Sequence, residues 1–378
     1  MVLPSATNDA ARRPDDDTVS TMVRAAHLPS LLAALAHATG DLSLLRADLR
    51  PDPARAQEPH GGLSPEQRRA ARDLAVEALG RGLPAEPPPP PDAASLRLMM
   101  EFALGTDVND EYFRLLMEEL GLSEQDLRAP GWHKDALDAG RDFRVVIIGA
   151  GMSGLLAAHR LRQAGVPVVI FEKNPDVGGT WFENRYPGCR VDVPNHLYSY
   201  SFAQRRHWPQ RFSTQDVLLD YFRACADDLD VRPDIRFGTE VVACRLSGDR
   251  GDWDVTVRTP AGDQERIRAD AVISAVGQLN RPSFPALEGR ESFAGPSFHS
   301  ARWEHDVDLT GRRVAVIGTG ASGIQLVPAI AGRVSSLEVF QRTPNWFMPT
   351  PDYHDPTPEG MEWLLDHVEL FDEDGNPM

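Results

Sequence analysis

The sequence predicts an α/β fold with two three-layer domains, each built on a parallel sheet, with a β-meander and a preceding α-helical extension. Two observations support the domains: a strand, glycine turn, helix and strand follow one another over residues 144–172, and the same pattern returns over residues 313–342. A third observation is a set of short β-rich runs between residues 237 and 277, separated by glycine and aspartate turns. Strands that alternate with helices are typical of parallel sheets.

Length and composition narrow the class of protein. The chain has 378 residues, which is enough for two or three domains. Its net charge of -17 argues against a nucleic-acid-binding protein, because such a protein needs a basic face. No apolar run reaches the roughly 18 residues of a membrane span, and the N-terminus lacks a signal-peptide core. We therefore expect a soluble, cytoplasmic protein.

The cysteines are few and widely spaced. Cys189, Cys225 and Cys244 form no CxxC pair and show no metal-ligand spacing. Such cysteines are typical of reduced thiols in a cytosolic protein. The sequence therefore predicts neither a zinc nor an iron–sulfur site.

Residues 1 to about 140 are predicted to form helices joined by proline-rich connections. Ser64 is expected to cap a helix that runs to about Leu79, with Pro65 in its first turn and Gln67 closing a capping box. Apolar residues also recur at helical spacing in residues 18–36, 95–104 and 110–120, and the proline-rich residues 84–91 favour an extended linker. We expect this extension to pack on the core or on a second subunit; a ligand-binding role is the alternative.

The first glycine turn is Gly149-x-Gly151-x-x-Gly154. It follows the apolar run 145–148 and precedes a helical pattern over residues 155–164. The first Gly permits the tight turn, the second lets a pyrophosphate approach the backbone, and the third lets the helix pack closely on the strand. The N-terminus of the helix then presents free N–H groups and partial positive charge to the phosphates. A glycine turn that binds no ligand is the alternative.

Glu172 ends the second apolar run of this unit, residues 166–171, and lies 18 residues after Gly154. A carboxylate at this place can accept hydrogen bonds from a ribose diol. The first unit therefore suits a cofactor with an unmodified ribose.

The second glycine turn is Gly318-x-Gly320-x-x-Gly323, between the strand pattern 313–317 and a helical pattern over residues 324–331. After the next strand pattern, 337–340, the place of the carboxylate is taken by Gln341, followed by Arg342. A guanidinium can hold a 2′-phosphate that a carboxylate would repel. The second unit therefore suits NADP, and the two units together predict FAD and NADPH in a flavoprotein oxidoreductase.

The remaining segments are predicted from their local patterns. A helix is expected over residues 216–226, a crossover between domains over 278–295 and a further helix over 357–370. A second nucleotide unit normally needs more strands than follow residue 340, so we expect the chain to be a fragment or a truncated form.

Two further motifs resemble the signatures of Baeyer–Villiger monooxygenases, the type I flavoproteins that use FAD and NADPH. One is Gly179-x-Trp181-x-x-x-x-Tyr186-Pro-Gly-x-x-x-Asp192. The other resembles the family's FxGxxxHxxxW fingerprint and comprises Phe293, Gly295, His299 and Trp303; Glu304 follows, where Pro or Asp is usual. The resemblance covers about residues 141–355. The helical extension, residues 132–135 and the run 275–282 resemble the 4-hydroxyacetophenone monooxygenase branch.

The resemblance implies a reaction and a set of site residues. NADPH reduces the FAD, the reduced flavin activates O2, and one oxygen atom is inserted next to a ketone carbonyl to give an ester or lactone. Asp192 is the implied catalytic residue, because the matching Asp of the family helps to position an active-site arginine. That arginine lies in a Lys-Arg stretch after the second unit, and no such stretch occurs before Met378. The predicted cofactor contacts are Gly149, Gly151, Gly154, Glu172, Gly179, Thr180, Trp181, Tyr186, Arg190, Val191, Tyr198, Val242, Gly318, Thr319, Gly320, Ala321, Ser322, Gly323, Arg342 and Thr343.

Several residues have a simpler alternative role. His299 fits a buried, hydrogen-bonded ring better than a proton donor, because most histidines are not catalytic. Trp181 and Tyr186 could be packing aromatics rather than flavin contacts. Arg342 and Thr343 could be an ordinary strand end at the surface.

The sequence also leaves other functions open. A flavin monooxygenase acting on nitrogen or sulfur would resemble FxGxxxHxxx followed by Tyr or Phe, so Trp303 argues against it. An inactive nucleotide-binding or interaction protein is a further alternative, whereas a disulfide reductase would need a CxxxxC that is absent.

The expected domains are the helical extension 1–140, the first part of an FAD domain 141–280, and the fingerprint with an incomplete NADPH domain 281–378. A small ketone and O2 are the expected partners, with a homodimer plausible through the extension and no nucleic acid or membrane.

Overall fold

A computed structural model of the chain describes residues 16–56, 58–84, 88–119, 126, 128–205, 207–248, 251–347, 349–350 and 353–367. The chain divides into two compact units. The first comprises Met1–Leu127, His196–Arg211 and Asp355–Met378, and the second comprises Arg128–Asn195 and Phe212–His354. The domain boundaries expected at residues 140 and 280 stay a prediction.

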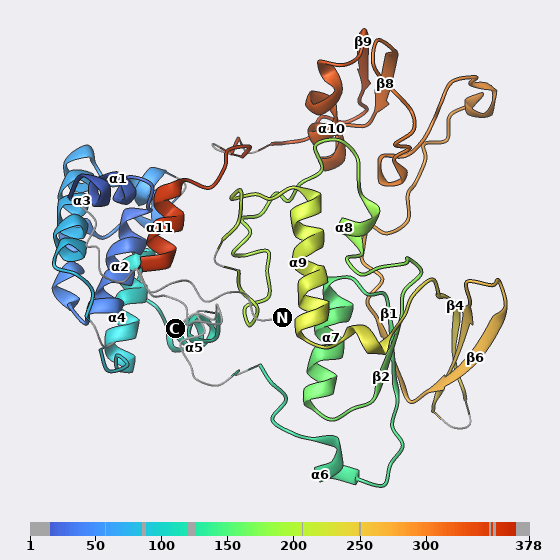
Figure 1. Ribbon diagram of the computed structural model, residues 1–378, viewed down its shortest axis with the longest axis horizontal. Helices are drawn as coiled ribbons and strands as arrows, with labels where there is room; N and C mark the ends of the chain where they lie inside the picture. Colours follow the sequence, from blue (N-terminus) through green and yellow to red (C-terminus); the bar gives the residue numbers. More distant parts are fainter. Residues whose placement is uncertain are drawn as a thin grey trace. The chain divides into compact units, whose positions relative to one another are not determined.

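The first unit is helical (Figure 1). Its α-helices are α1 (Asp16–Val23), α2 (Leu28–Thr39), α3 (Pro65–Gly80), α4 (Ala93–Leu104), α5 (Asp110–Glu119) and α11 (Glu359–His367). Short 3-10 turns lie between α2 and α3 at Leu42–Leu44, Ala47–Leu49, Pro53–Arg55 and Pro59–Gly62. The helices at 64–79 and 95–104 are confirmed. α5 covers the expected helix as far as Glu119, and residues 85–87, 120 and 368–370 of the expected linker and helices lie outside the described residues.

The capping box of α3 is present as predicted. The Ser64 hydroxyl accepts a hydrogen bond from the Gln67 backbone N–H at 3.2 Å, and the Gln67 carboxamide accepts one from the Ser64 N–H at 2.8 Å. The helical pattern over residues 18–36 forms two helices rather than one, because Pro29 in the first turn of α2 has no N–H to continue a helix from α1.

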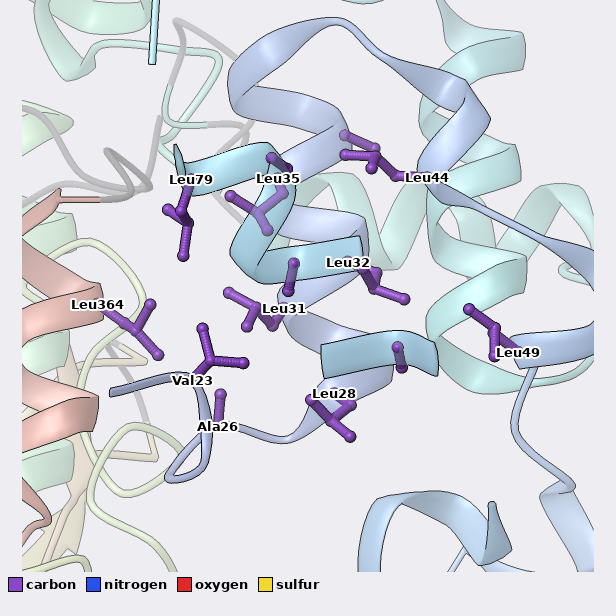
Figure 2. Close-up of a cluster of buried hydrophobic side chains, with 14 of the residues drawn as sticks. Val23, Ala26, Leu28, Leu31, Leu32, Leu35, Leu44, Leu49, Leu79 and Leu364 are labelled. Atoms are coloured by element: carbon purple, nitrogen blue, oxygen red, sulfur yellow. The ribbon is translucent and has the colours of Figure 1, made fainter. Parts of the chain in front are cut away.

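The core of the first unit joins segments that are far apart in the sequence (Figure 2). Val23 from α1, Leu28 and Leu35 from α2, and Leu364 from α11 are buried in one hydrophobic cluster. The C-terminal helix α11 therefore packs on the N-terminal helices. The segments 196–211 and 355–367 belong to this helical unit, which the sequence pattern did not indicate.

The second unit contains a four-stranded parallel sheet in the order β3-β2-β1-β7. Its strands are β1 (Val145–Ile148), β2 (Val168–Phe171), β3 (Ile235–Arg236) and β7 (Ala271–Ser274), and Val145 pairs with both Val168 and Ala271. The helices α7 (Met152–Gln163) and α9 (Gln215–Asp228) lie beside each other along this sheet (Figure 1), and the short helices α6 (Lys134–Asp138) and α8 (Thr180–Glu183) also belong to this unit.

A β-meander packs on this sheet. Its antiparallel strands are β4 (Glu240–Leu246), β5 (Trp253–Arg258) and β6 (Gln264–Ala269). Val255 and Val257 of the meander share a buried cluster with Val146 and Phe171 of the sheet. The predicted third β-rich run, 265–277, divides at Asp270 into β6 of the meander and β7 of the parallel sheet. Asp270 leaves the ladder there because its carboxylate accepts the Arg144 N–H at 2.9 Å.

The second glycine turn lies in a smaller βαβ element. The strands β8 (Arg313–Ile317) and β9 (Ser336–Phe340) are parallel, with Arg313 opposite Ser336, and α10 (Ala321–Ala331) connects them. Three further 3-10 turns cover Arg232–Asp234, Arg290–Ser292 and Ser300–Arg302. No helix in the part of the chain that the structure describes is both long and apolar enough to span a membrane.

Candidate nucleotide-binding sites

The first glycine turn has the geometry that its sequence predicts. Gly149 adopts a φ of 100°, which side chains strongly disfavour, and its N–H donates to the carbonyl of Phe171 at 2.9 Å. A Cβ on Gly154 would lie only 1.9 Å from the Gly149 carbonyl oxygen. The helix α7 can therefore approach the turn this closely only with glycine at position 154.

A second pair of glycines faces this turn. The N–H of Gly178 donates to the carbonyl of Ala150 at 3.0 Å. Gly179 has a φ of 51°, and a Cβ on it would lie 3.0 Å from the Gly151 Cα. Gly151 is the N-cap of α7, and no side chain at this position caps the helix. Gly149, Gly151, Gly154, Gly178 and Gly179 together form a cradle of bare backbone that fits a pyrophosphate.

Glu172 lies at this cradle and is 4% exposed. Its Oε2 accepts the N–H of Ala150 at 2.7 Å and its Oε1 accepts the N–H of Asn174 at 2.8 Å. The carboxylate therefore braces the glycine turn itself, a role that the spacing did not predict. Each carboxylate oxygen has a second lone pair, so the ribose contact stays a prediction.

The second glycine turn repeats the geometry of the first. Gly318 has a φ of 108°, and its N–H donates to the carbonyl of Phe340 at 2.8 Å. A Cβ on Gly323 would lie 2.6 Å from the Gly318 carbonyl oxygen. Gly320 is the N-cap of α10, and Ala321 and Ser322 form the first turn of that helix. This cradle therefore fits a second pyrophosphate.

The end of β9 carries the predicted phosphate contacts. Arg342 and Thr343 are exposed, and Arg342 has no ion-pair partner among the residues that the structure describes. Thr319 donates a hydrogen bond to the Gln341 carboxamide at 3.4 Å, and Asn345 donates to the Thr319 carbonyl. The guanidinium of Arg342 thus fits a 2′-phosphate at this site.

The segment from Tyr186 to Asp192 contacts the second nucleotide unit through Gln325 of α10. The Gln325 carboxamide accepts the Tyr186 hydroxyl at 2.8 Å, and its Nε2 donates to the carbonyl of Arg190 and to the Tyr353 hydroxyl, each at 2.9 Å. Tyr353 in turn donates to the carbonyl of Val191 at 3.0 Å. This network fixes the backbone just before the predicted catalytic residue, Asp192, which is exposed.

Burial in this segment suppresses ionisation of a phenol and a thiol. It raises the pKa of the Tyr186 phenol, which is 7% exposed, and it raises the pKa of the Cys189 thiol to about 11. Both side chains are therefore protonated at neutral pH. Trp181 is likewise 7% exposed, so the contact of Trp181 and Tyr186 with a flavin stays a prediction beside their observed packing.

The guanidinium of Arg190 forms no ion pair with a carboxylate in the described part of the chain. Its Nη1 donates to the carbonyl of Tyr353 at 2.6 Å, and its guanidinium lies 5.3 Å from the centroid of the Tyr353 ring. Its buried Nε has no hydrogen-bond partner in the structure. An unsatisfied buried donor of this kind is suited to an acceptor on a bound ligand.

The fingerprint residues lie between the two glycine turns in the sequence and form a half-exposed segment. The His299 ring accepts the Ala301 N–H at Nδ1 (3.1 Å) and packs edge-on against Phe284. Burial, with a smaller effect from Arg302, lowers the pKa of His299, so the ring is neutral at pH 7. Trp303 packs edge-on against Phe298, while Phe293 is 64% exposed and Gly295 lies against its ring.

Two predicted contacts belong to segments other than those that form the glycine turns. Tyr198 belongs to the first compact unit, whereas the turns belong to the second. Val242 sits at an irregularity in β4, between Val241 and Ala243, and is 37% exposed. Their contacts with a cofactor stay predictions. No cluster of His, Cys, Asp or Glu suited to a metal ion is found among the described residues.

Glu183 is a site residue that the sequence did not single out. Its side chain is 11% exposed and lies between Lys173, at 2.8 Å, and Arg302, at 2.9 Å. Burial alone would raise the pKa of Glu183, but the hydrogen bonds from Lys173 and Asn174 and the nearby positive charges outweigh burial and lower it. Glu183 is therefore an ionised carboxylate. Its partners are distant in sequence, as are those of Gln325, so no local pattern indicated either residue.

These features define a dinucleotide-binding α/β protein with two glycine cradles of different chemistry. Residues 142–355 match the profile of the flavin-binding monooxygenase-like family, which is more than half of the chain. The chain belongs to the flavin-binding monooxygenase-like family.

Individual relatives agree with this assignment. The chain is 36% identical over 357 residues to an uncharacterized monooxygenase of Sinorhizobium fredii, covering 94% of this chain and 53% of that protein. It is 48% identical over 211 residues to a Baeyer-Villiger monooxygenase of Streptomyces coelicolor, covering 55% of this chain and 40% of that protein. The chain thus spans about half, or less, of the length of these relatives.

Solved structures share the fold of more than half of this chain. The crystal structure of cyclohexanone monooxygenase from Rhodococcus sp. Phi1 bound to NADP+ is 37% identical with a TM-score of 0.53, covering 59% of this chain and 42% of that one. The structure of OTEMO in complex with FAD and NADP is 38% identical with a TM-score of 0.54, covering 64% of this chain and 44% of that one.

Proposed function

We propose that the protein is an FAD-dependent, NADPH-consuming monooxygenase that inserts one oxygen atom of O2 next to a ketone carbonyl and so forms an ester or lactone. The observation that carries this proposal is the pair of glycine cradles, one followed by the carboxylate of Glu172 and the other by the exposed guanidinium of Arg342. The FxGxxxHxxxW fingerprint between them and the names of the relatives support the Baeyer–Villiger type of oxygenation.

Each of the two cradles would hold one of the two cofactors. The first, at Gly149 to Gly154 and Gly179, would hold the pyrophosphate of FAD, with Glu172 stiffening the turn. The second, at Gly318 to Gly323, would hold NADPH, with Arg342 and Thr343 on the 2′-phosphate. When bound, the flavin supplies the oxygen chemistry and the nicotinamide supplies the hydride.

The remaining residues position groups and exclude water. Gln325 and Tyr353 hold the backbone from Arg190 to Val191 in one conformation, and Asp192 follows directly. The fixed backbone would place the Asp192 carboxylate where it can orient a cation that stabilises negative charge on the reacting oxygen. Buried Trp181 and Tyr186 would shield the reacting atoms from water.

The branch of the family, the substrate, the oligomeric state and the location in the cell are also proposals. The helical extension and the residues Trp132 to Asp135 favour the 4-hydroxyacetophenone monooxygenase branch, and with it an aryl ketone as substrate. A homodimer formed through the helical unit and a cytoplasmic location are consistent with this assignment.

The proposal is tested with purified protein, FAD, NADPH, 18O-labelled O2 and an aryl methyl ketone, followed by mass spectrometry of the product. One labelled oxygen in an ester establishes Baeyer–Villiger oxygenation. NADPH consumption with hydrogen peroxide as the only product would retain the cofactors and reject this ketone. No NADPH consumption at all would contradict the proposal and favour an inactive nucleotide-binding protein.

Oxygenation at nitrogen or sulfur is the second candidate. Trp303, where that branch has Tyr or Phe, argues against it. The same assay with a thioether or tertiary amine in place of the ketone separates the two. A labelled sulfoxide or N-oxide formed without any ester would favour the second candidate.

A further inference from the structure

A chain of one ion pair and several hydrogen bonds runs from the fingerprint segment to the first glycine turn. Arg302, within the fingerprint, forms an ion pair with Glu183 Oε2 at 2.9 Å. Glu183 Oε1 accepts the side-chain N–H of Asn174 at 3.1 Å. The backbone N–H of Asn174 donates to Glu172, and Glu172 accepts the N–H of Ala150 inside the turn.

Glu183 contacts both the fingerprint segment, through Arg302, and the segment next to the first glycine turn, through Asn174. On one side, Lys173 lies 2.8 Å from its Oε1 and also donates to Asn280 at 2.8 Å. On the other side is Arg302. The Glu183 side chain is 11% exposed, while Lys173 and Arg302 are 35% and 46% exposed. A carboxylate so withdrawn from water, with both oxygens engaged by cations, is held more firmly than a surface ion pair.

The fingerprint itself has a short ordered turn at the point of contact. The Arg302 N–H donates to the His299 carbonyl at 2.8 Å, and the Ala301 N–H donates to the His299 ring at 3.1 Å. These bonds fix the backbone from His299 to Arg302. Movement of Arg302 would therefore move His299 with it.

We propose that Glu183 is a positioning residue that fastens the fingerprint segment, through Arg302, to the first nucleotide-binding turn, through Asn174 and Glu172. Occupancy of that turn and order in the fingerprint are then coupled. A nucleotide that stabilises the turn also stabilises residues 299–303, and loss of the Glu183 carboxylate separates the two. The inference deepens the proposed function, because it takes the ligand of the first turn to be FAD.

Glu183 and Arg302 border a pocket of about 550 Å³, and Glu240 and Arg258 border the same pocket. The second pair supplies a matched control variant. The Glu240–Arg258 pair has a similar separation of 2.9 Å, but it joins two neighbouring strands of the meander and touches neither the turn nor the fingerprint. Glu240→Gln therefore removes a carboxylate from the same pocket without breaking the chain of hydrogen bonds.

The first measurement is hydrogen–deuterium exchange of residues 299–303 in the full chain without nucleotide. Glu183→Gln and Arg302→Gln should each speed exchange of this segment about three- to tenfold, as expected for loss of a partly exposed ion pair. The double variant should exchange no faster than either single variant, because both remove one link. Exchange in β4–β6 should not change. Equal exchange in Glu183→Gln and Glu240→Gln would overturn the inference.

The second measurement adds FAD. In the unchanged chain and in Glu240→Gln, FAD should slow hydrogen exchange of residues 299–303. In Glu183→Gln, FAD should no longer slow this exchange. The Kd of Glu183→Gln for FAD should also rise about three- to tenfold. FAD protection that persists in Glu183→Gln would overturn the coupling. Failure of the unchanged chain to bind FAD would contradict the proposed function, and the link through Glu183 would then be judged from exchange without nucleotide.

Discussion

In the second nucleotide unit, Arg342 lies next to the position that matches Glu172 of the first unit. A guanidinium near this position, in place of a carboxylate, distinguishes the two nucleotide sites. We predict that Arg342→Ala raises the Kd for NADP+ about tenfold and leaves the Kd for NAD+ unchanged, because only NADP+ carries the phosphate that the guanidinium would bind. Isothermal titration calorimetry with both nucleotides measures the difference. Arg313→Ala, at the opposite end of β8, is the control and should bind both as the unchanged protein does. Equal weakening of NAD+ and NADP+ would contradict a phosphate contact.

His299 makes the fingerprint turn sensitive to pH. Its pKa lies below the ordinary 6.5, chiefly through burial, so folding favours the neutral ring. The contribution of the neutral ring is fully present above the ordinary pKa and is lost as pH falls through the lowered pKa of the folded state. Protonation of Nδ1 removes the acceptor for the Ala301 N–H. Acid should therefore loosen residues 300–302.

The amide resonance of Ala301, followed by NMR against pH, checks this prediction. In the unchanged protein it should shift with a midpoint below 6.5. In His299→Asn the side-chain oxygen can accept the same N–H and does not titrate, so the shift should disappear. The same pH dependence in His299→Asn would assign the titration to another group.

Single residues were predicted from the sequence where one position dictates the backbone. Gly149 and Gly318 could be assigned because a tight turn after a strand needs a positive φ. Glu183 and Gln325 could not, because their partners lie in other segments and are brought together only by folding. Glu172 was found by spacing, but its bond to Ala150 was not foreseen.

At the scale of elements, the two βαβ units make separable predictions. A Cβ on Gly154 would lie 1.9 Å from a backbone oxygen of the first turn, and one on Gly323 would lie 2.6 Å from a backbone oxygen of the second. Neither backbone can yield cheaply, and overpacking of this kind costs about 1–3 kcal/mol or more. We predict that Gly154→Ala abolishes FAD binding, while Gly323→Ala weakens NADP+ binding and spares FAD.

Flavin absorbance of the purified variants and calorimetry with NADP+ measure these effects. Gly332→Ala is the control, because a Cβ at that position, just after α10, meets no atom within 4 Å and the backbone φ of -76° suits alanine. Loss of FAD in Gly323→Ala as well, with the fold retained, would mean that the two turns do not serve separate ligands.

Elements with a strong local pattern were predicted well. β1 occupies the predicted residues 145–148, and the capping box located the start of α3. The helical pattern at 18–36 was divided by Pro29, and the β-rich run at 265–277 was divided by Asp270 between two sheets. Which sheet a short apolar strand joins depends on packing partners, so periodicity alone could not decide it.

At the scale of the whole molecule, the second compact unit carries both glycine turns, the fingerprint and Asp192. The assembly of the helical unit from three separate segments could not be read from the sequence, because nearly all of its buried cluster comes from the N-terminal segment and the last segment adds only Leu364 as a buried member. The central claim concerns the second unit: one glycine turn binds FAD, the other binds NADPH, and electrons pass from the second cofactor to the first.

Anaerobic mixing of the FAD-loaded protein with NADPH tests this claim most directly, with the visible absorbance of the flavin as the signal. The account predicts that NADPH bleaches the flavin, that NADH does so much more slowly, and that admission of O2 restores the absorbance. A chain that retains no FAD, or a bound flavin that NADPH leaves unbleached, would contradict it.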